Sequence, residues 1–465
     1  MTTAILFVLF CSLFLALSYL ESRRAQTLDD FCLAGRSASG WSAGLSIAAS
    51  SIGASATIGV CGLAFEAGFP AFWWLGAGAI GLALSAILLV DRIRAQRPVS
   101  LLGAIEESAG RPAAKLAAIV ILAAWTGILA AQFSAMGRLF AAALGEWLPG
   151  GPAATALGAF FITGATLLGG QRAVLRSDVC QSAVMAVGLA ALLLSLLFDP
   201  GDTFSASPAI ENFRFELWND AFGPNEWFEF MLLIGGSYLV CPMLSARFLA
   251  ASTKRDAHVA AGVGIAGLLA GALVIVLIGL AARSFVAPGT EPDAVLPALL
   301  ETRSPVFGAL FLFVMTSAVL SSADSCLITS ATVGAVDLAG RRDVRTIRGI
   351  AIALALAALA ASLSGRGILS LLLTANALYV CGVVPVAFAA LRASRPLHPV
   401  FAAAAVLSGS LLGSIGALDL FGRDYSLGFS AAGFAAAYLI ARLGRTRDSR
   451  ALFFTDRAAR SSDPS

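Results

Sequence analysis

Long uncharged apolar stretches constrain this chain more than any other feature. Roughly 20 consecutive apolar residues cross a bilayer as a helix, and only helices or closed barrels satisfy the backbone there. The sequence shows no strand-like alternation, so it predicts an all-α polytopic membrane protein with about thirteen transmembrane helices. The expected spans are 4–20, 38–60, 71–91, 114–140, 151–170, 178–198, 226–246, 257–283, 306–336, 346–365, 367–391, 397–418 and 426–442.

Charge is scarce as well as unevenly placed. Charged residues make up 13% of the chain, about half the share of a soluble domain. The net charge of +3 is too small to attract nucleic acid or an acidic partner. These values exclude an ordinary soluble enzyme, a disordered chain and a nucleic-acid binder. We expect no enzymatic activity and no obligate protein partner, only a small-molecule solute and the lipid bilayer.

The charges between the spans predict the orientation. Twenty-five Lys and Arg residues fall on one side of the thirteen spans. Five fall on the other side, namely Arg214, Arg283, Arg303, Arg366 and Arg423. Short loops rich in Lys and Arg stay in the cytoplasm. The count therefore predicts a multi-pass protein of the cell membrane, with its N-terminus outside and its C-terminus in the cytoplasm.

No soluble domain is expected beside the membrane part. Residues 1–442 read as a single transmembrane domain, in which 4–20 is a retained first helix, and the basic tail 443–465 reads as disordered. Neither loops nor tail are long enough for an ATPase or kinase domain, so the energy must come from a gradient or from nothing. The seven cysteines form no CxxC pair, and the two histidines have no metal-ligand neighbour.

Two spans differ from plain lipid-facing helices. Span 38–60 is dense in Gly, Ser and Thr, and span 306–336 carries Asp324 amid apolar sequence. A carboxylate inside a span is costly and by default functional. On the second span Ser321 and Ser322 follow Ala318 at i+3 and i+4, which gathers their oxygens on one face. A backbone break near 50–53 would free carbonyls at the same depth, so the pair suggests a sodium site. Hydroxyls that only bond to their own helix are the alternative.

Several local strings resemble one known family. The first string is DFCLAGRS at 30–37, just before the expected span 38–60. The next strings are GGQRAV at 169–174 and SDVCQ at 177–181. The strings RFLAA at 247–251 and SSADS at 321–325 follow in order. Together they resemble motifs of the sodium:solute symporter family, which includes the sodium–glucose, proline and choline cotransporters. The resemblance implies sodium-coupled symport of a small organic solute into the cell by alternating access.

The resemblance also implies a fold and a site. The fold would be of the leucine-transporter type, with inverted five-helix repeats over about 38–391 and three peripheral helices, 4–20, 397–418 and 426–442. The family's main sodium site uses two backbone carbonyls on the first core helix, and one carbonyl with two hydroxyls on the eighth. These fall on Ala49, Ile52, Ala318, Ser321 and Ser322.

Other polar positions receive weaker assignments. Asp178 and Asp324 are expected below the sodium site as an exit path, although Asp178 also reads as an N-terminal helix cap. Cys241 and Met243 stand where sugar transporters carry polar ligands, which argues against a sugar. Two alternatives stay open: proton coupling through either aspartate, and a solute sensor without transport. The expected substrate pocket is Trp73, Gln132, Tyr238, Asn376 and Tyr379.

Overall fold

A computed structural model describes most of the chain and contains only helices as regular elements. The described residues are 2–22, 27–95, 98–145, 147–148, 151–198, 215–364, 368–393, 396–417 and 423–443. Within these ranges the β pairing is confined to isolated bridges, such as Ala38 with Ala251. The predicted disorder of the tail concerns residues that lie, except Leu443, outside the described part of the chain.

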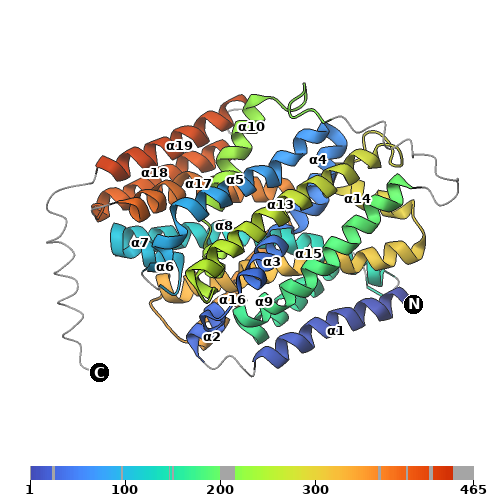
Figure 1. The fold of residues 1–465 in the computed structure, drawn as a ribbon, viewed down its shortest axis with the longest axis horizontal. Helices are drawn as coiled ribbons and strands as arrows, with labels where there is room; N and C mark the ends of the chain where they lie inside the picture. Colours follow the sequence, from blue (N-terminus) through green and yellow to red (C-terminus); the bar gives the residue numbers. More distant parts are fainter. Residues whose placement is uncertain are drawn as a thin grey trace.

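The helices follow the expected spans closely. Their bounds are α1 Thr2–Ser22, α2 Leu28–Leu33, α3 Gly40–Ser51, α4 Val60–Ala67, α5 Trp73–Leu88, α6 Val90–Ala95, α7 Leu101–Ala109, α8 Arg111–Leu144, α9 Pro152–Leu197, α10 Pro224–Phe230, α11 Gly236–Leu239, α12 Pro242–Ala250, α13 Lys254–Ala282, α14 Pro292–Glu301, α15 Pro305–Thr332, α16 Val344–Ser362, α17 Ile368–Arg392, α18 Pro399–Ala417 and α19 Arg423–Leu443. Figure 1 shows α1 along one edge of the molecule and α18 and α19 along the opposite edge.

The number of spans is the least settled part of the predicted architecture. Ten helices of the described residues are long and apolar enough to cross a membrane, and a bent pair of helices makes an eleventh span. Helix α9 is counted once although two spans were expected there, and the apolar part of α19, Leu427–Leu443, is shorter than a full span. The count of thirteen therefore stays a prediction.

Helix α9 consists of two halves that meet at Gly170. A straight helix of its 46 residues would be about 69 Å long, more than twice the hydrocarbon thickness. Gly170 has a φ of 61°, which favours glycine. A side chain at this position would also overlap Phe31. The turn therefore requires glycine both for its backbone angle and for its close packing.

Two spans are broken in the middle. Helix α3 ends at Ser51, and the helical segment Ser55–Ala67 continues at an angle of 60°. This confirms the predicted break near 50–53. A second break separates α11 from α12, where Val240 and Cys241 are extended. The sequence analysis missed this break, although Pro242 at the start of α12 signals it, because proline lacks the N–H that a continuous helix needs.

Close helix packing positions the first broken helix. Side chains at Gly40 and Gly44, one turn apart on α3, would overlap Val259 and Val263 of α13. Small residues four positions apart let two helices approach closely in a membrane. Helix α3 is thus held along α13, far from it in sequence, and its broken end lies inside the bundle.

Candidate functional site

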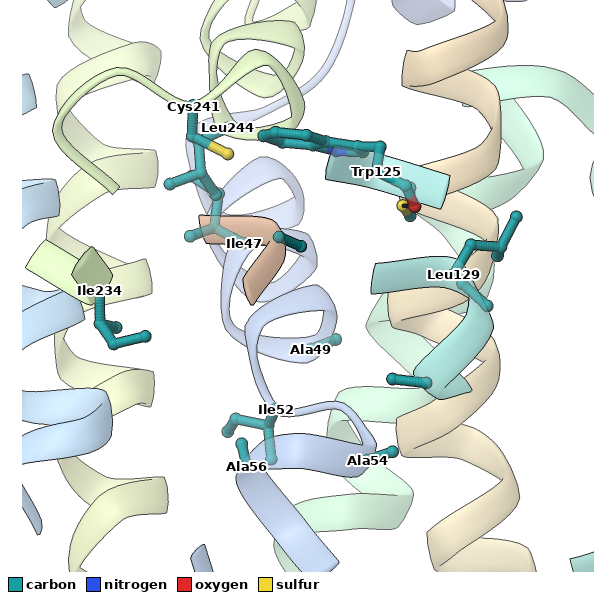
Figure 2. Close-up of a cluster of buried hydrophobic side chains, with 14 of the residues drawn as sticks. Ile47, Ala49, Ile52, Ala54, Ala56, Trp125, Leu129, Ile234, Cys241 and Leu244 are labelled. Atoms are coloured by element: carbon teal, nitrogen blue, oxygen red, sulfur yellow. Dashed lines mark hydrogen bonds between the residues drawn. The ribbon is translucent and has the colours of Figure 1, made fainter. Parts of the chain in front are cut away.

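The broken end of α3 meets the middle of α15. Figure 2 shows the chain leaving α3 at Ile52 and turning toward Ala54, on the side of α8 residues Trp125 and Leu129. The Ser322 hydroxyl donates a hydrogen bond to the Ser50 carbonyl at 2.8 Å. The last carbonyls of a helix lack intrahelical partners and carry its negative dipole end. The break therefore presents oxygens and partial negative charge to α15.

The predicted sodium ligands lie on the two elements that meet here, and all five residues are buried. Ala49 and Ile52 stand at the end of α3, and Ala318, Ser321 and Ser322 lie on α15. The Ala49 carbonyl accepts from the Ile52 N–H at 3.2 Å and keeps a second lone pair. The Ser321 hydroxyl faces Asp178 without completing a hydrogen bond of standard geometry. These oxygens are what a hard cation would use.

Gln132 of α8 stands on the other side of the break. Its amide oxygen accepts from the Ala54 N–H at 3.2 Å, and its side chain is 2% exposed. It thereby satisfies one of the donors that the start of a helical segment leaves unpaired. A side chain at Gly53 would overlap Ser322 and crowd Gln132. Glycine is thus required where α8, α15 and the break converge.

The other predicted pocket residues separate into two groups. Tyr379 donates through its hydroxyl to the Val240 carbonyl, so it ties α17 to the second break. Tyr238 packs against Gly78, and Asn376 is buried on α17. Trp73 lies elsewhere: its indole N–H donates to the Leu217 carbonyl at 3.2 Å, within an aromatic cluster that includes Trp218 and Trp227. Trp73 thus belongs to this aromatic cluster, whereas Gln132 and Tyr379 contact the two helix breaks.

Asp178 forms a buried ion pair that the sequence analysis missed. Its Oδ2 lies 3.5 Å from Nη2 of Arg247, and both side chains are 0% exposed. The Ser46 hydroxyl donates to the same carboxylate oxygen. Arg247 donates in addition to Ser46 at 3.1 Å, to the Met243 carbonyl at 3.1 Å and to Ser325. This arginine therefore joins α3, α9 and α15 to its own helix α12.

The capping interpretation of Asp178 is wrong. The second half of α9 follows Gly170 directly, so Asp178 lies two turns inside the helix rather than at its start. Its side chain faces Arg247 instead of free N–H groups. The span boundary was placed too late because Arg172 and Arg176, which precede Asp178, were assigned to a loop.

Asp324 has a different environment from Asp178. The Thr166 hydroxyl donates to its Oδ1, and the carboxyl is 4% exposed. Thr166 belongs to the first half of α9. Consecutive residues of a helix point about 100° apart, so Ser325 turns toward Arg247 while the adjacent Asp324 turns toward Thr166.

The opposite end of the bundle carries another arginine pair. Arg138 of α8 lies 3.5 Å from Asp293 of α14, with side chains 49% and 18% exposed. Helix α14 packs against α4, where a side chain at Gly62 would overlap Pro292. Arg283, after α13, donates to the carbonyls of Phe65 and Glu66 at the end of α4. Contacts near the surface therefore connect α4, α8, α13 and α14 at this end.

Two broken helices that meet oxygen-bearing side chains inside a multi-span bundle define a secondary transporter. The chain belongs to the sodium:solute symporter family, whose model matches residues 31–342. A curated relative, the sodium/pantothenate symporter of Haemophilus influenzae, is 25% identical over 346 residues, which are 69% of this chain and 68% of the relative. The protein is accordingly a sodium-coupled symporter of a solute, and sodium is the co-transported ion.

Solved structures confirm the leucine-transporter-type fold. A sodium-coupled sialic acid symporter in a substrate-bound outward-open state matches with a TM-score of 0.78 and 14% identity, over 95% of this chain and 97% of the other. MhsT in complex with L-phenylalanine matches with a TM-score of 0.58 and 16% identity, over 87% of this chain and 98% of the other. Mhp1, a nucleobase-cation-symport-1 family transporter, matches with a TM-score of 0.55 and 15% identity, over 88% of this chain and 92% of the other.

Proposed function

We propose that sodium binds where the break of α3 faces α15. The ligands are the carbonyl oxygens of Ala49, Ile52 and Ala318 and the hydroxyls of Ser321 and Ser322. The contact that carries the proposal is the hydrogen bond from Ser322 to the Ser50 carbonyl, which brings the two ligand-bearing elements into register. A cation there would meet the negative end of α3 and the unsatisfied Ser321 hydroxyl.

The serines provide the direct test. Replacing Ser321 and Ser322 by Ala removes two hydroxyl ligands that water cannot replace in a closed site. We expect the sodium concentration for half-maximal uptake to rise by about tenfold or more, with surface expression near normal. The matched control is Ser317→Ala, which removes another buried hydroxyl without a hydrogen-bond partner from the same helix. Equal sodium dependence of the double variant and the control would contradict the proposed site.

The solute is proposed to be a small organic acid. Gln132, Tyr379 and Asn376 are buried and polar but uncharged. The helical segment beyond the break begins next to Gln132, which already accepts from the Ala54 N–H, and the positive dipole end of such a helix start favours an anionic group. Pantothenate is the first compound to test because a relative is named for it.

Uptake into proteoliposomes decides the substrate. Radiolabelled pantothenate should accumulate under an inward sodium gradient and not under an equal potassium gradient. Failure of pantothenate to accumulate or to compete with an accepted solute would reject it as the substrate, and sodium binding to the purified protein would still report on the ion site.

The orientation is also proposed. With the N-terminus outside, α7 and α12 face the cytoplasm and α14 faces outward, which agrees with the 25-to-5 distribution of Lys and Arg. A single cysteine introduced at Asp343 should then resist a membrane-impermeant thiol reagent in intact cells, and it should react after the membrane is opened. Labelling of this cysteine in intact cells would reverse the orientation.

A further inference from the structure

A small closed cavity lies beside Arg247, toward the α7 end of the bundle. Its volume is about 10 Å³, and its lining includes Cys32, Gln171, Ala246, Thr329 and Thr332. A cavity of this size holds about one water-sized particle. The lining comes from α2, the start of α7 with Val99 and Ser100 before it, α9, α12, α15 and Val333 after α15. Helices α9, α12 and α15 also contribute to the Arg247 network.

Two side chains in the lining have polar atoms without partners. Gln171 Nε2 and Thr329 Oγ1 make no hydrogen bond, and the two residues are 1% and 7% exposed. Buried polar atoms normally have a hydrogen-bond partner, so these two atoms indicate that the cavity is occupied by a water molecule or an ion. Rotating the Gln171 amide by half a turn places its oxygen at the position of the nitrogen. The cavity can therefore offer oxygen atoms from both residues.

The cavity continues a row of hydroxyls on α15. Ser321, Ser325, Thr329 and Thr332 are spaced by four, four and three residues, so they share one face of the helix. They cover about 16 Å along its axis. Ser325 accepts from Arg247, and Ala246 beside that arginine lines the cavity. The arginine thus stands between the proposed sodium site and the cavity.

We propose that this cavity is a transient site for a monovalent cation, occupied by sodium after it leaves the Ser321 region and before it reaches the cytoplasm. The proposal rests on the proposed sodium site. Neutral oxygens from Thr329 and Gln171 suit a brief stop, because a path requires sites favourable enough to enter and weak enough to leave. Arg247 would have to withdraw from Ser325 for a cation to pass.

Cys32 gives the cavity a native reporter. It is 4% exposed, and burial raises the pKa of its thiol to about 11. Only the thiolate reacts with thiosulfonate reagents, so labelling requires the cavity to open and hydrate. The variant for the experiment keeps Cys32 as its sole cysteine, with the other six replaced by Ala.

The experiment compares two reagents of similar size, one cationic (ethylammonium methanethiosulfonate) and one neutral (methyl methanethiosulfonate). The measured quantity is the ratio of their labelling rates at Cys32, divided by the same ratio for free cysteine. We expect a ratio raised about tenfold, because a site that binds cations about 1.4 kcal/mol better than neutral molecules favours the cationic reagent by that factor. The ratio should be lowered by sodium but not by N-methylglucamine. Because both reagents need the same opening, the ratio cancels any effect of sodium on the opening itself.

Side-chain variants locate the effect. Thr329→Val and Gln171→Leu should each return the ratio toward that of free cysteine. Thr316→Val is the matched control, since Thr316 is a buried threonine of α15 whose hydroxyl also lacks a hydrogen-bond partner, and it should leave the ratio raised. Equilibrium binding of radioactive sodium to each purified variant verifies that it is folded.

The outcomes separate this proposal from the one on which it rests. A ratio equal to that of free cysteine, with sodium binding retained, would mean that the cavity holds a buried water only and would overturn the proposal. A ratio that Thr316→Val lowers as much as Thr329→Val does would overturn it as well. Absence of sodium binding in the unmodified protein would instead refute the Ser321 site.

Discussion

Two of the arginine–carboxylate pairs among the described residues, Arg247–Asp178 and Arg138–Asp293, have the same length and opposite surroundings. In both pairs a guanidinium nitrogen lies 3.5 Å from a carboxylate oxygen. The Arg247–Asp178 pair is 0% exposed on both sides, whereas Arg138 and Asp293 are 49% and 18% exposed. Breaking a buried pair by removing one partner costs about 3–5 kcal/mol, while an exposed pair contributes about 0–1 kcal/mol. The two pairs therefore differ in the free energy lost when one partner is removed because they differ in burial, not in distance.

The two pairs also differ in what they connect. Arg247 joins α12 to α3, α9 and α15 through Ser46, Asp178 and Ser325. Arg138 connects α8 to α14 near the surface. Opening the α12 end must therefore rearrange several buried hydrogen bonds together. Opening the α14 end breaks an ion pair that is already accessible to water.

Removing Arg247 should have the largest effect. Arg247→Ala leaves Asp178 buried without a counter-charge, which should destabilise the protein by about 3–5 kcal/mol and abolish sodium-driven uptake. The measurement is the thermal unfolding midpoint in detergent together with uptake in vesicles. The double variant Arg247→Ala, Asp178→Ala should recover part of the lost stability. An unchanged midpoint of the single variant would show that the buried pair is not stronger than the exposed one.

Neutralising Asp178 should have an intermediate effect. Asp178→Asn keeps the size of the side chain and a hydrogen-bond acceptor for Ser46, but it removes the charge that would attract sodium on its way out. It also leaves Arg247 without its counter-charge, so the variant should lose stability as well. We expect the uptake rate to fall about tenfold, with equilibrium sodium affinity nearly unchanged. Rate and binding should be measured on the same purified variant. A normal rate would reject the exit role, and lost binding would mean that Asp178 holds the ion directly.

The exposed Arg138–Asp293 pair should matter least. Arg138→Gln removes an exposed pair, so we expect a change below about 1 kcal/mol in stability and less than about fivefold in uptake rate. The small effect should shrink further at high salt, because salt screens exposed charges. Uptake at low and high ionic strength measures this. A loss as large as that of Arg247→Ala would remove the difference between the two ends.

The sequence predicted the spans and the first break but could not show the buried pair. Apolar runs long enough to cross a membrane are readable one span at a time, and so is the Gly- and Ser-rich segment around Gly53. Arg247 was counted among the cytoplasmic charges because an arginine after an apolar span normally marks a loop. Its partners Ser46 and Asp178 come from distant segments, so the ion pair exists only after the helices pack.

The candidate site was likewise predictable only in part, because its geometry depends on how distant helices pack. The five proposed sodium ligands follow from a motif, and the structure brings the two helices that carry them together. Their role as ligands stays a prediction. The different environments of Asp178 and Asp324 could not be predicted from the sequence, which placed both residues on one exit path. Which neighbour a helix face meets depends on packing, and Thr166 faces only one of the two carboxyls.

The broken helix also has a consequence for how the chain enters the membrane. Its two α-helical parts, Gly40–Ser51 and Val60–Ala67, have 12 and 8 residues, each too short to cross the hydrocarbon alone. The backbone groups freed between them are satisfied by Gln132 and Ser322, which the ribosome adds much later. Until those residues arrive, the break is an unsatisfied backbone in lipid, which is costly. The first core span therefore reaches its final form only after its distant partners are synthesised, so its insertion is completed late although its synthesis comes early.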